Sequence, residues 1–254
     1  MKGPRAVLDG IPGFGNAIIE SRLDGGLASR SYRVGCNGEW FVLRIDTPEA
    51  ARLGLNRTAE HAVIRAVAGA GLGPGAVYCE PEAGVLLRPF IPGRPWTRDD
   101  LLQAKNLARL ADRLRGLHDI PFAGSRFDPM AAAARYAEQL GSDQARAHLQ
   151  RLRNIHASLE RVEPVLCHND LVCQNILEAG GPVLIDWEFA APGDSLFDLA
   201  VVVQHHDLGS DLAGIFLQAY FGRPPTAGER ARFSAQCALY RELLGLWNLR
   251  LRDL

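Results

Sequence analysis

Apolar and polar residues follow one another in the first third of the chain in a way that predicts short antiparallel strands. Residues 31–34 and 40–45 are two such runs, and an Asn-Gly pair between them is typical of a tight hairpin turn. Two further runs, 76–79 and 85–87, are joined by a turn that contains Gly84. We therefore expect two hairpins in a small antiparallel sheet near the N-terminus.

Helical periodicity dominates the remaining chain. Thr47 followed by Pro48 marks a helix start, with threonine as the N-cap and proline in the first turn. We expect this helix to include Glu60, which shares a face with apolar residues at helical spacing. Thr97 begins the next helix with a capping-box pattern. Further helices are expected over residues 130–140, 144–160, 196–206, 211–221 and 227–251.

These elements predict an α+β fold in two lobes, the first a small antiparallel sheet with a helix and the second mainly helical. The Arg-Pro-Phe-Ile-Pro-Gly stretch over residues 88–93 has little helical or strand character. It places the boundary near residue 92 and gives lobes of residues 1–92 and 93–254.

One stretch of the second lobe carries most of the candidate chemistry. The apolar run 164–167 predicts a strand, and residues 176–178 and 183–185 flank a glycine-containing turn as another hairpin. Asn175 and Asp186 then lie at the two open ends of this hairpin, eleven positions apart in the sequence. An amide oxygen and a carboxylate suit Mg²⁺, a hard cation that takes oxygen ligands.

Asp170 lies on the adjoining loop, five residues before Asn175. A carboxylate there is placed to accept a proton from a substrate hydroxyl. A base followed by an asparagine and a second aspartate is the pattern of kinase catalytic loops, which transfer phosphoryl groups. The alternative is that these residues only form a capped turn and the end of a surface strand. That alternative explains any one of the three residues better than it explains all three in this order.

Two motifs resemble the choline/ethanolamine kinase family: Leu-Cys-His-Asn-Asp-Leu at 166–171 and Leu-Ile-Asp-Trp-Glu-Phe-Ala at 184–190. A third similarity runs from the Gly-Asp pair at 193–194 to Asp-Leu-Ala at 198–200. This family belongs to the larger aminoglycoside phosphotransferase group, which also holds bacterial thiamine kinases. The resemblance extends roughly from residue 23 to the C-terminus. It implies a protein-kinase-like fold and a kinase that uses ATP and Mg²⁺ on a small-molecule alcohol.

The resemblance also implies a nucleotide grip in the first lobe. The backbone of Gly25 and Gly26 would approach the phosphates, and Ser29 would add a polar side chain where the family usually has Thr-Asn. Arg44 would hold the phosphates. Glu60 lies on the apolar face of its helix, where an unpaired charge is costly, so we expect it to pair with Arg44. The alternative is a solvated Glu60 at the edge of that face.

Backbone groups at the lobe boundary would bind adenine, through the carbonyl of Arg88 and the N–H of Phe90 or Ile91. By the same resemblance, Asp198 ties down the catalytic loop, with helix N-capping as the alternative role. His168 is expected to brace this loop by hydrogen bonds.

Aromatic and acidic side chains are the candidates for the acceptor pocket. Tyr240 and Trp247 are seven residues apart in the last expected helix, so they share a face and, with Trp187 or Trp96, would wall a pocket for a quaternary ammonium group. Glu188 would add negative charge. The alternative is that these aromatic residues belong to the core. Choline or ethanolamine is the expected acceptor, thiamine or a sugar or aminoglycoside is the alternative, and an inactive nucleotide-binding scaffold is the alternative of another class.

Composition narrows the possible partners. With 254 residues, a net charge of −1 and 22% charged residues, the chain has no basic bias that would indicate nucleic-acid binding. It has neither a run of eighteen apolar residues nor a signal-peptide core, so we expect a cytoplasmic protein without membrane partners. An odd count of five cysteines favours reduced thiols. The expected state is a monomer or a homodimer.

Overall fold

A computed structural model of the protein describes residues 3–23 and 26–252. Its internal contacts divide the chain into two compact units. The first comprises Met1–Arg94 together with Val183–Phe189, and the second comprises Pro95–Pro182 and Ala190–Leu254. The segment Val183–Phe189, which carries Asp186, thus packs with the first unit although the sequence places it within the expected second lobe.

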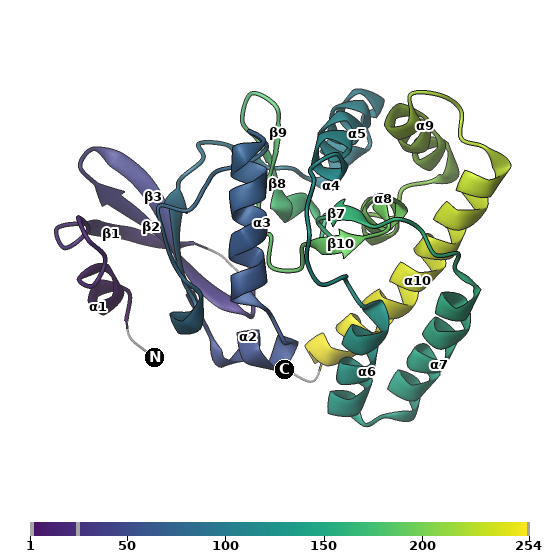
Figure 1. Ribbon diagram of the computed structural model, residues 1–254, viewed down its shortest axis with the longest axis horizontal. Helices are drawn as coiled ribbons and strands as arrows, with labels where there is room; N and C mark the ends of the chain where they lie inside the picture. The colour runs from purple at the N-terminus through teal and green to yellow at the C-terminus, as the bar shows by residue number, and fades with distance from the viewer. Residues whose placement is uncertain (1–2, 24–25, 253–254) are drawn as a thin grey trace. The chain divides into compact units, whose positions relative to one another are not determined.

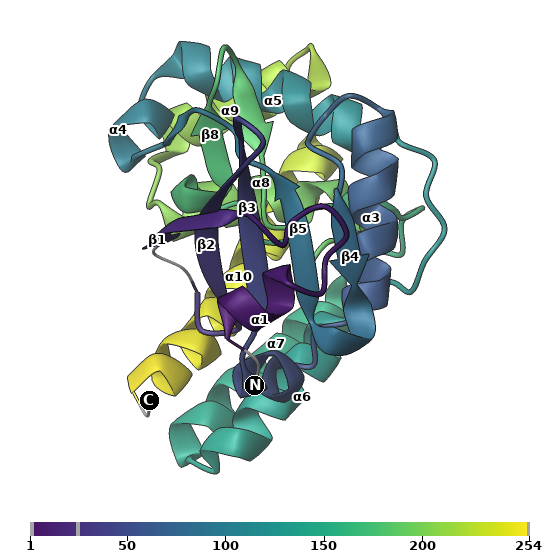
Figure 2. The same cartoon turned by 90° about the vertical axis from the view of Figure 1, so that its left-hand side faces the viewer.

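The first unit is built on a five-stranded antiparallel sheet in the order β1-β2-β3-β5-β4 (Figures 1 and 2). Both predicted hairpins are present. In the first, Asn37 and Gly38 have φ values of 51° and 82°, the left-handed pair that a tight two-residue turn requires. The strands are β1 (Ile18–Leu23), β2 (Ser29–Cys36), β3 (Glu39–Asp46), β4 (Tyr78–Glu80) and β5 (Val85–Pro89).

Side chains alternate between the two faces of this sheet. Leu43 and Leu87 are opposite one another and join a buried cluster with Leu8 of α1 (Pro4–Leu8). Arg44 is the next residue after Leu43 on β3 and therefore points to the other face. Arg88 of β5 is paired with Val42 of β3 and points to that other face as well. One face of the sheet thus forms the core with α1, and the other presents two arginines.

The helix expected from Thr47 through Glu60 is in fact two helices, α2 (Pro48–Leu53) and α3 (Arg57–Gly69). Gly54 ends α2 in the left-handed conformation, at φ 69°, and Asn56 begins α3 by accepting a hydrogen bond from the Ala59 N–H. The expectation of one helix was wrong because apolar spacing continues across this break, whereas glycine and asparagine mark it locally.

The second unit is mainly helical. Its longest helix, α10 (Ala227–Arg252), contacts α8, α7 and α6 (Figure 1). The strands β7 (Val165–Cys167) and β10 (Ala191–Gly193) pair antiparallel beside α5 and α8. The other helices are α4 (Arg98–Leu101), α5 (Ala104–His118), α6 (Pro129–Leu140), α7 (Asp143–Ser158), α8 (Ser195–His205) and α9 (Ser210–Phe221).

Local sequence signals explain the ends of several of these elements. Thr97 and Asp100 form the predicted capping box at the start of α4, although that helix ends before α5 begins. A turn with Gly180 at φ 77° connects β8 (Ile176–Glu178) to β9 (Pro182–Leu184), and β6 is the short strand Arg94–Pro95. An antiparallel sheet followed by a mostly helical remainder confirms the expected α+β class.

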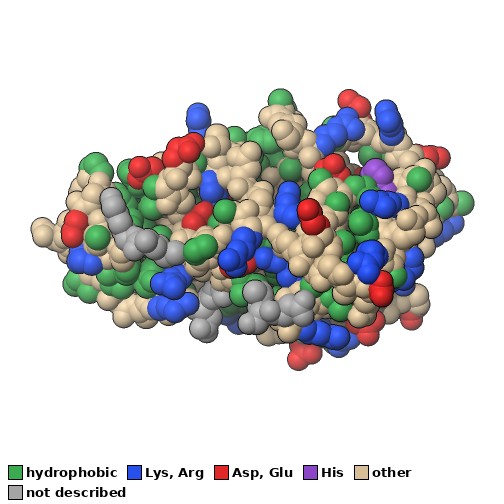
Figure 3. Space-filling view, turned by 90° about the horizontal axis from the view of Figure 1, so that it is seen from below, with side chains coloured by type: hydrophobic (Ala, Val, Ile, Leu, Met, Phe, Trp, Pro, Cys, Tyr) green, Lys and Arg blue, Asp and Glu red, His purple; other side chains and the backbone are tan. Residues whose placement is uncertain are grey.

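Within the described parts of the chain, no helix has both the length and the apolar character needed to cross a membrane. All five cysteines are free. On the face seen in Figure 3, arginine and lysine side chains are intermingled with carboxylates, as the net charge of −1 leads one to expect.

Candidate active site

The predicted ion pair between Arg44 and Glu60 is present in the first unit. The two guanidinium nitrogens of Arg44 lie 2.5 and 2.6 Å from the two carboxylate oxygens of Glu60, a bidentate arrangement. Both side chains are buried, with exposed fractions of 11% and 3%. Burial alone would raise the pKa of Glu60, but hydrogen bonding to Arg44 and the nearby Arg57 charge lower it below the usual range. Glu60 is therefore a buried carboxylate, and Arg44 is held rigidly on its sheet face.

Arg57, at the start of α3, connects this pair to two further carboxylates. It donates two hydrogen bonds of 2.8 Å to Asp46, one of 2.8 Å to Glu60 and one of 3.0 Å to Glu188. The Arg57 side chain is only 7% exposed. The sequence offered one weak signal, the three-residue spacing from Glu60, because an arginine in the first turn of a helix usually faces solvent.

Replacing Arg57 with methionine should lower the free energy of unfolding by about 3–5 kcal/mol, because three carboxylates would lose a buried cation. Urea-induced unfolding of the two proteins measures this difference. Arg52→Met is the matched control: Arg52 pairs with Glu49 but is 67% exposed, so its loss should cost under about 1 kcal/mol. Equal losses in both variants would contradict a structural role for the Arg57 network.

Asp186 and Glu188 differ sharply in their surroundings. Asp186 has a positive φ of 67°, its carboxylate is 41% exposed, and it lies 3.7 Å from the Arg44 guanidinium. The Glu188 side chain is only 12% exposed and bonded to Arg57. Burial and the adjacent Asp186 charge raise the pKa of Glu188 to about 8. Glu188 is thus part of the Arg57 network. Its expected role in adding negative charge for an acceptor stays a prediction.

The glycine turn and the boundary between the lobes were predicted to contact the nucleotide. Gly25 lies outside the described residues, and Gly26 has open space around its Cα. Ser29 begins β2. At the boundary, the N–H of Phe90 donates to the carbonyl of Trp40 at 2.8 Å, so Ile91 is the better candidate of the two amides proposed to bind a base.

Arg88 shares the sheet face of Arg44. Burial lowers the pKa of its guanidinium to about 10, with Asp186 opposing and Arg44 adding to this change. The guanidinium donates to the carbonyl of Pro89 at 3.2 Å. This face therefore presents two cations near one exposed carboxylate.

The loop predicted to be catalytic follows β7 in the second unit and is held by Asp198. The two carboxylate oxygens of Asp198 accept the backbone N–H groups of His168 and Asn169, at 2.8 and 2.7 Å. Asp198 is fully buried, and the N-cap of α8 is Asp194, so the alternative capping role for Asp198 was wrong. His168 accepts the N–H of Asp170 on its Nδ1, at 3.3 Å, which is a bracing contact of the expected kind.

Asp170 and Asn175 contact each other directly. The Asn175 amide nitrogen donates to the backbone carbonyl of Asp170 at 2.8 Å and to its carboxylate at 3.0 Å. This orientation fixes the Asp170 carboxylate and leaves the amide oxygen of Asn175 as the atom of that side chain suited to a cation. Burial and, secondarily, the Asp170 charge raise the pKa of Tyr240.

The aromatic residues proposed for the acceptor pocket have different partners. Tyr240 bonds to the His205 ring at 2.9 Å. Trp247 is half-buried beside Tyr136, and the Arg250 guanidinium lies 5.7 Å from the Trp247 ring centre. A protein cation already occupies one side of Trp247. Trp187 belongs to the first unit and is buried.

His206 gives a pH-dependent stability. Burial and then the His205 charge lower the pKa of His206 from 6.5 to about 4. As the pH falls, the unfolded chain therefore takes up a proton on His206 near pH 6.5, whereas the folded protein takes it up only near pH 4. The contribution of neutral His206 to stability is complete above pH 6.5 and is lost as the pH falls from 6.5 to 4. We expect the free energy of unfolding to drop by about 1 kcal/mol from pH 7 to 5. Urea titrations should show a smaller drop for His206→Gln, and an unchanged drop would contradict this assignment.

The sequence model described as the phosphotransferase enzyme family matches residues 20–233. A LicA protein of Haemophilus influenzae is 27% identical over 208 residues, which cover 77% of this chain but only 61% of that protein. A thiamine kinase of Escherichia coli is 28% identical over 211 residues, covering 74% of this chain and 69% of the kinase.

Solved structures share the whole architecture. A choline/ethanolamine kinase family protein from Mesorhizobium loti superposes with a TM-score of 0.78 at 25% identity, over 98% of this chain and 85% of that protein. An aminoglycoside-3'-phosphotransferase of type VIII superposes with a TM-score of 0.70 at 22% identity, over 95% and 97%. The second likeness concerns the fold alone.

Proposed function

Since the chain belongs to the phosphotransferase enzyme family, which matches it over residues 20–233, we propose that it transfers the γ-phosphoryl group of ATP to the hydroxyl of a small amino alcohol. The observation that carries this proposal is the fixed carboxylate of Asp170. Its side chain is bonded to Asn175, and its loop is bonded to the buried Asp198. A rigid carboxylate on a braced loop suits a base that orients a hydroxyl.

The chemistry asked of the chain is mainly positioning. Asp170 would accept the hydroxyl proton as the oxygen attacks the γ-phosphorus, and the nucleoside diphosphate would leave. The transition state of such a transfer is loose, so orientation and charge neutralisation account for most of the rate. The hydrogen bond from Asn175 keeps the Asp170 carboxylate oriented, and the tie to Asp198 limits movement of the loop.

The nucleotide grip is proposed for the face of the N-terminal sheet that carries Arg44. Arg44 is preorganised there by Glu60 and can offer a bidentate contact to phosphate oxygens. Gly25, Gly26 and Ser29 would contribute the phosphate-binding turn. The carbonyl of Arg88 and the N–H of Ile91 are the groups proposed for adenine.

Magnesium fits the chemistry of the proposed ligands. The carboxylate of Asp186 is 41% exposed, and the amide oxygen of Asn175 is the part of its side chain not bonded to Asp170. Both are hard oxygen donors of the kind that Mg²⁺ prefers. When bound, the ion would neutralise charge on the phosphates.

Choline or ethanolamine is the proposed acceptor. The LicA and thiamine kinase relatives and the choline/ethanolamine kinase family structure support a small alcohol that carries a cationic group. Tyr240 is proposed to contribute as well, because an aromatic ring can attract a cation. Thiamine is the second candidate, favoured by the 28% identity to a thiamine kinase.

The proposal is tested by nucleotide consumption with Mg²⁺ in the presence of choline, ethanolamine, thiamine or an aminoglycoside. Saturable turnover on choline or ethanolamine, lost in Asp170→Ala, is the expected result. Turnover on thiamine or the aminoglycoside alone would replace the proposed acceptor. Mg-ATP binding with no turnover on any of the four would favour an inactive nucleotide-binding scaffold.

A further inference from the structure

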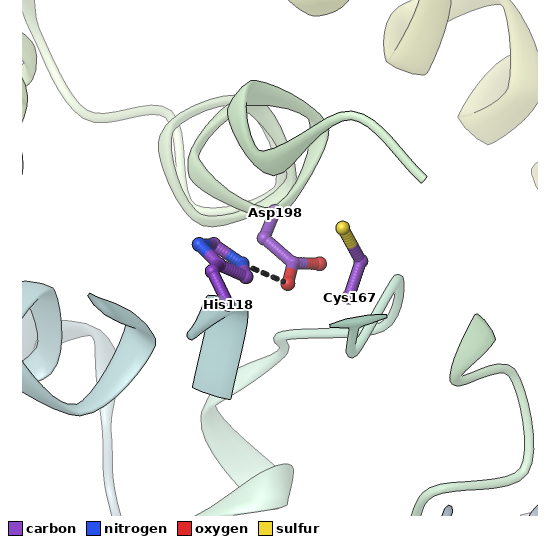
Figure 4. Close-up of side chains that lie close together, drawn as sticks. All are labelled: His118, Cys167 and Asp198. Atoms are coloured by element: carbon purple, nitrogen blue, oxygen red, sulfur yellow. Dashed lines mark hydrogen bonds and ion pairs between the residues drawn. The ribbon is translucent and has the colours of Figure 1, made fainter. Parts of the chain in front are cut away.

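A buried chain of hydrogen bonds leads from α9 to the catalytic loop. The Tyr220 hydroxyl lies 2.7 Å from Nδ1 of His118, and Nε2 of His118 lies 3.1 Å from the carboxylate of Asp198. His118 ends α5 and Asp198 belongs to α8, so three helices meet at this chain. Figure 4 shows the His118 ring directed at the Asp198 carboxylate, with the Cys167 thiol on the other side of that carboxylate.

The proton positions in this chain follow from its two ends. The Asp198 carboxylate can only accept, so His118 carries a proton on Nε2 and donates it there. In the tautomer with that single proton, Nδ1 accepts and the Tyr220 hydroxyl donates. Tyr220 remains a donor because burial raises its pKa to about 12, although a hydrogen bond from Ser195 acts in the opposite direction. Tyr220 thereby selects the tautomer in which His118 can bond to Asp198.

The Asp198 carboxylate accepts three hydrogen bonds at the start of the loop. One oxygen of Asp198 accepts from His118 Nε2 and from the His168 N–H, and the other accepts from the Asn169 N–H. Asn169 has a φ of 65°, a conformation that costs a non-glycine residue about 1 kcal/mol or more unless its surroundings hold it. The Asp198 carboxylate must therefore keep one orientation for the loop to keep its shape.

We propose that His118 is a positioning residue for the catalytic loop, that it acts by fixing the Asp198 carboxylate, and that Tyr220 sets its tautomer. This role rests on the proposed function in one respect: its effect on rate passes through Asp170, the next residue after the two amides that Asp198 holds. His118 touches neither substrate nor nucleotide in this scheme. Its loss should therefore lower kcat and leave the KM for ATP unchanged.

A metal site is the competing explanation, because ligand atoms of His118, Cys167 and Asp198 all lie within 4.8 Å of one another. One observation argues against it. Both Asp198 oxygens already accept N–H groups. Both ring nitrogens of His118 have hydrogen-bond partners in this chain, without an ion.

Four variants separate these explanations in steady-state kinetics. His118→Phe should lower kcat about 10- to 100-fold, the range usual for residues that orient a catalytic group. His118→Gln retains an N–H donor and should recover part of this loss. Tyr220→Phe removes one hydroxyl and should lower kcat by a smaller factor. Cys167→Ala should keep the wild-type kcat, and a loss equal to that of His118→Phe would overturn the proposal in favour of a metal site.

Amide hydrogen exchange over residues 166–171 tests the same role without turnover. The His168 and Asn169 amides should exchange faster in His118→Phe and Tyr220→Phe, while Cys167→Ala and peptides from α10 keep wild-type rates. If His118→Phe does not fold, Tyr220→Phe still decides the question. Unchanged exchange in Tyr220→Phe would overturn the proposal. Absence of turnover in the wild-type protein would instead count against the proposed function, which the exchange result does not require.

Discussion

Replacing Asp186 with alanine is expected to lower kcat by at least about 1,000-fold, because charge neutralisation by a bound metal contributes several kcal/mol and each 1.4 kcal/mol is a factor of ten. The fold should survive the change. The Asp186 carboxylate is 41% exposed, and its contact with Arg44, at 3.7 Å, is the long pairing of an exposed group, worth under about 1 kcal/mol. Steady-state kinetics and thermal unfolding measure these two effects separately.

The metal dependence of nucleotide binding distinguishes loss of a metal ligand from general damage. In the wild-type protein, titration calorimetry should show that Mg²⁺ strengthens ATP binding. In Asp186→Ala this strengthening should be largely absent. Asp143→Ala is the matched control, since the Asp143 side chain is 98% exposed and the residue is remote in the sequence from the proposed metal ligands. This variant should behave as wild type in the kinetic and calorimetric assays. A normal Mg²⁺ effect in Asp186→Ala would remove Asp186 from the metal site.

Asp170→Ala is expected to lower kcat by about 100- to 10,000-fold, the usual contribution of a general base. ATP binding should persist, because Asp170 belongs to the acceptor side of the proposed reaction. The variant also frees the Asn175 amide from its 3.0 Å bond to the carboxylate, which should cost about 1 kcal/mol of stability. Kinetics, calorimetry with Mg-ATP and urea unfolding together describe this variant.

Asp170→Asn refines the assignment of the base. It keeps the size of the side chain and an oxygen that can accept the Asn175 hydrogen bond, but it cannot take a proton at neutral pH. We expect its kcat to be as low as that of Asp170→Ala while its stability stays near wild type. Near-normal turnover in either variant would show that another group accepts the proton.

The Asp170→Ala variant also bears on how the acceptor is bound. Asp170→Ala removes the proton acceptor but leaves Tyr240 in place, so binding of a cationic alcohol should be largely retained. Tyr240 itself bonds to His205 at 2.9 Å, and Trp247 faces Arg250. Of the two aromatic residues of α10, Tyr240 is therefore the one whose substitution should change the KM for the acceptor.

Much of the fold was determined by the sequence at short range. The Asn-Gly turn, the capping box at Thr97 and the helical periodicity all act between residues a few positions apart, and the structure has each of them. The Arg44–Glu60 pair was predicted correctly over a longer separation in the sequence. The prediction followed from the rule that a carboxylate on the apolar face of a helix needs a cationic partner, and Arg44 on strand β3 was such a cation.

Only the tertiary structure decided which polar groups meet. Arg57 binds Glu188, 131 positions away, a pairing that the sequence did not predict. His118 meets Tyr220 across 102 positions and Asp198 across 80. Turns and helix caps depend on backbone preferences within a few residues. The choice among many possible ionic and hydrogen-bond partners depends instead on which side chains packing buries together, and desolvation then obliges those groups to pair.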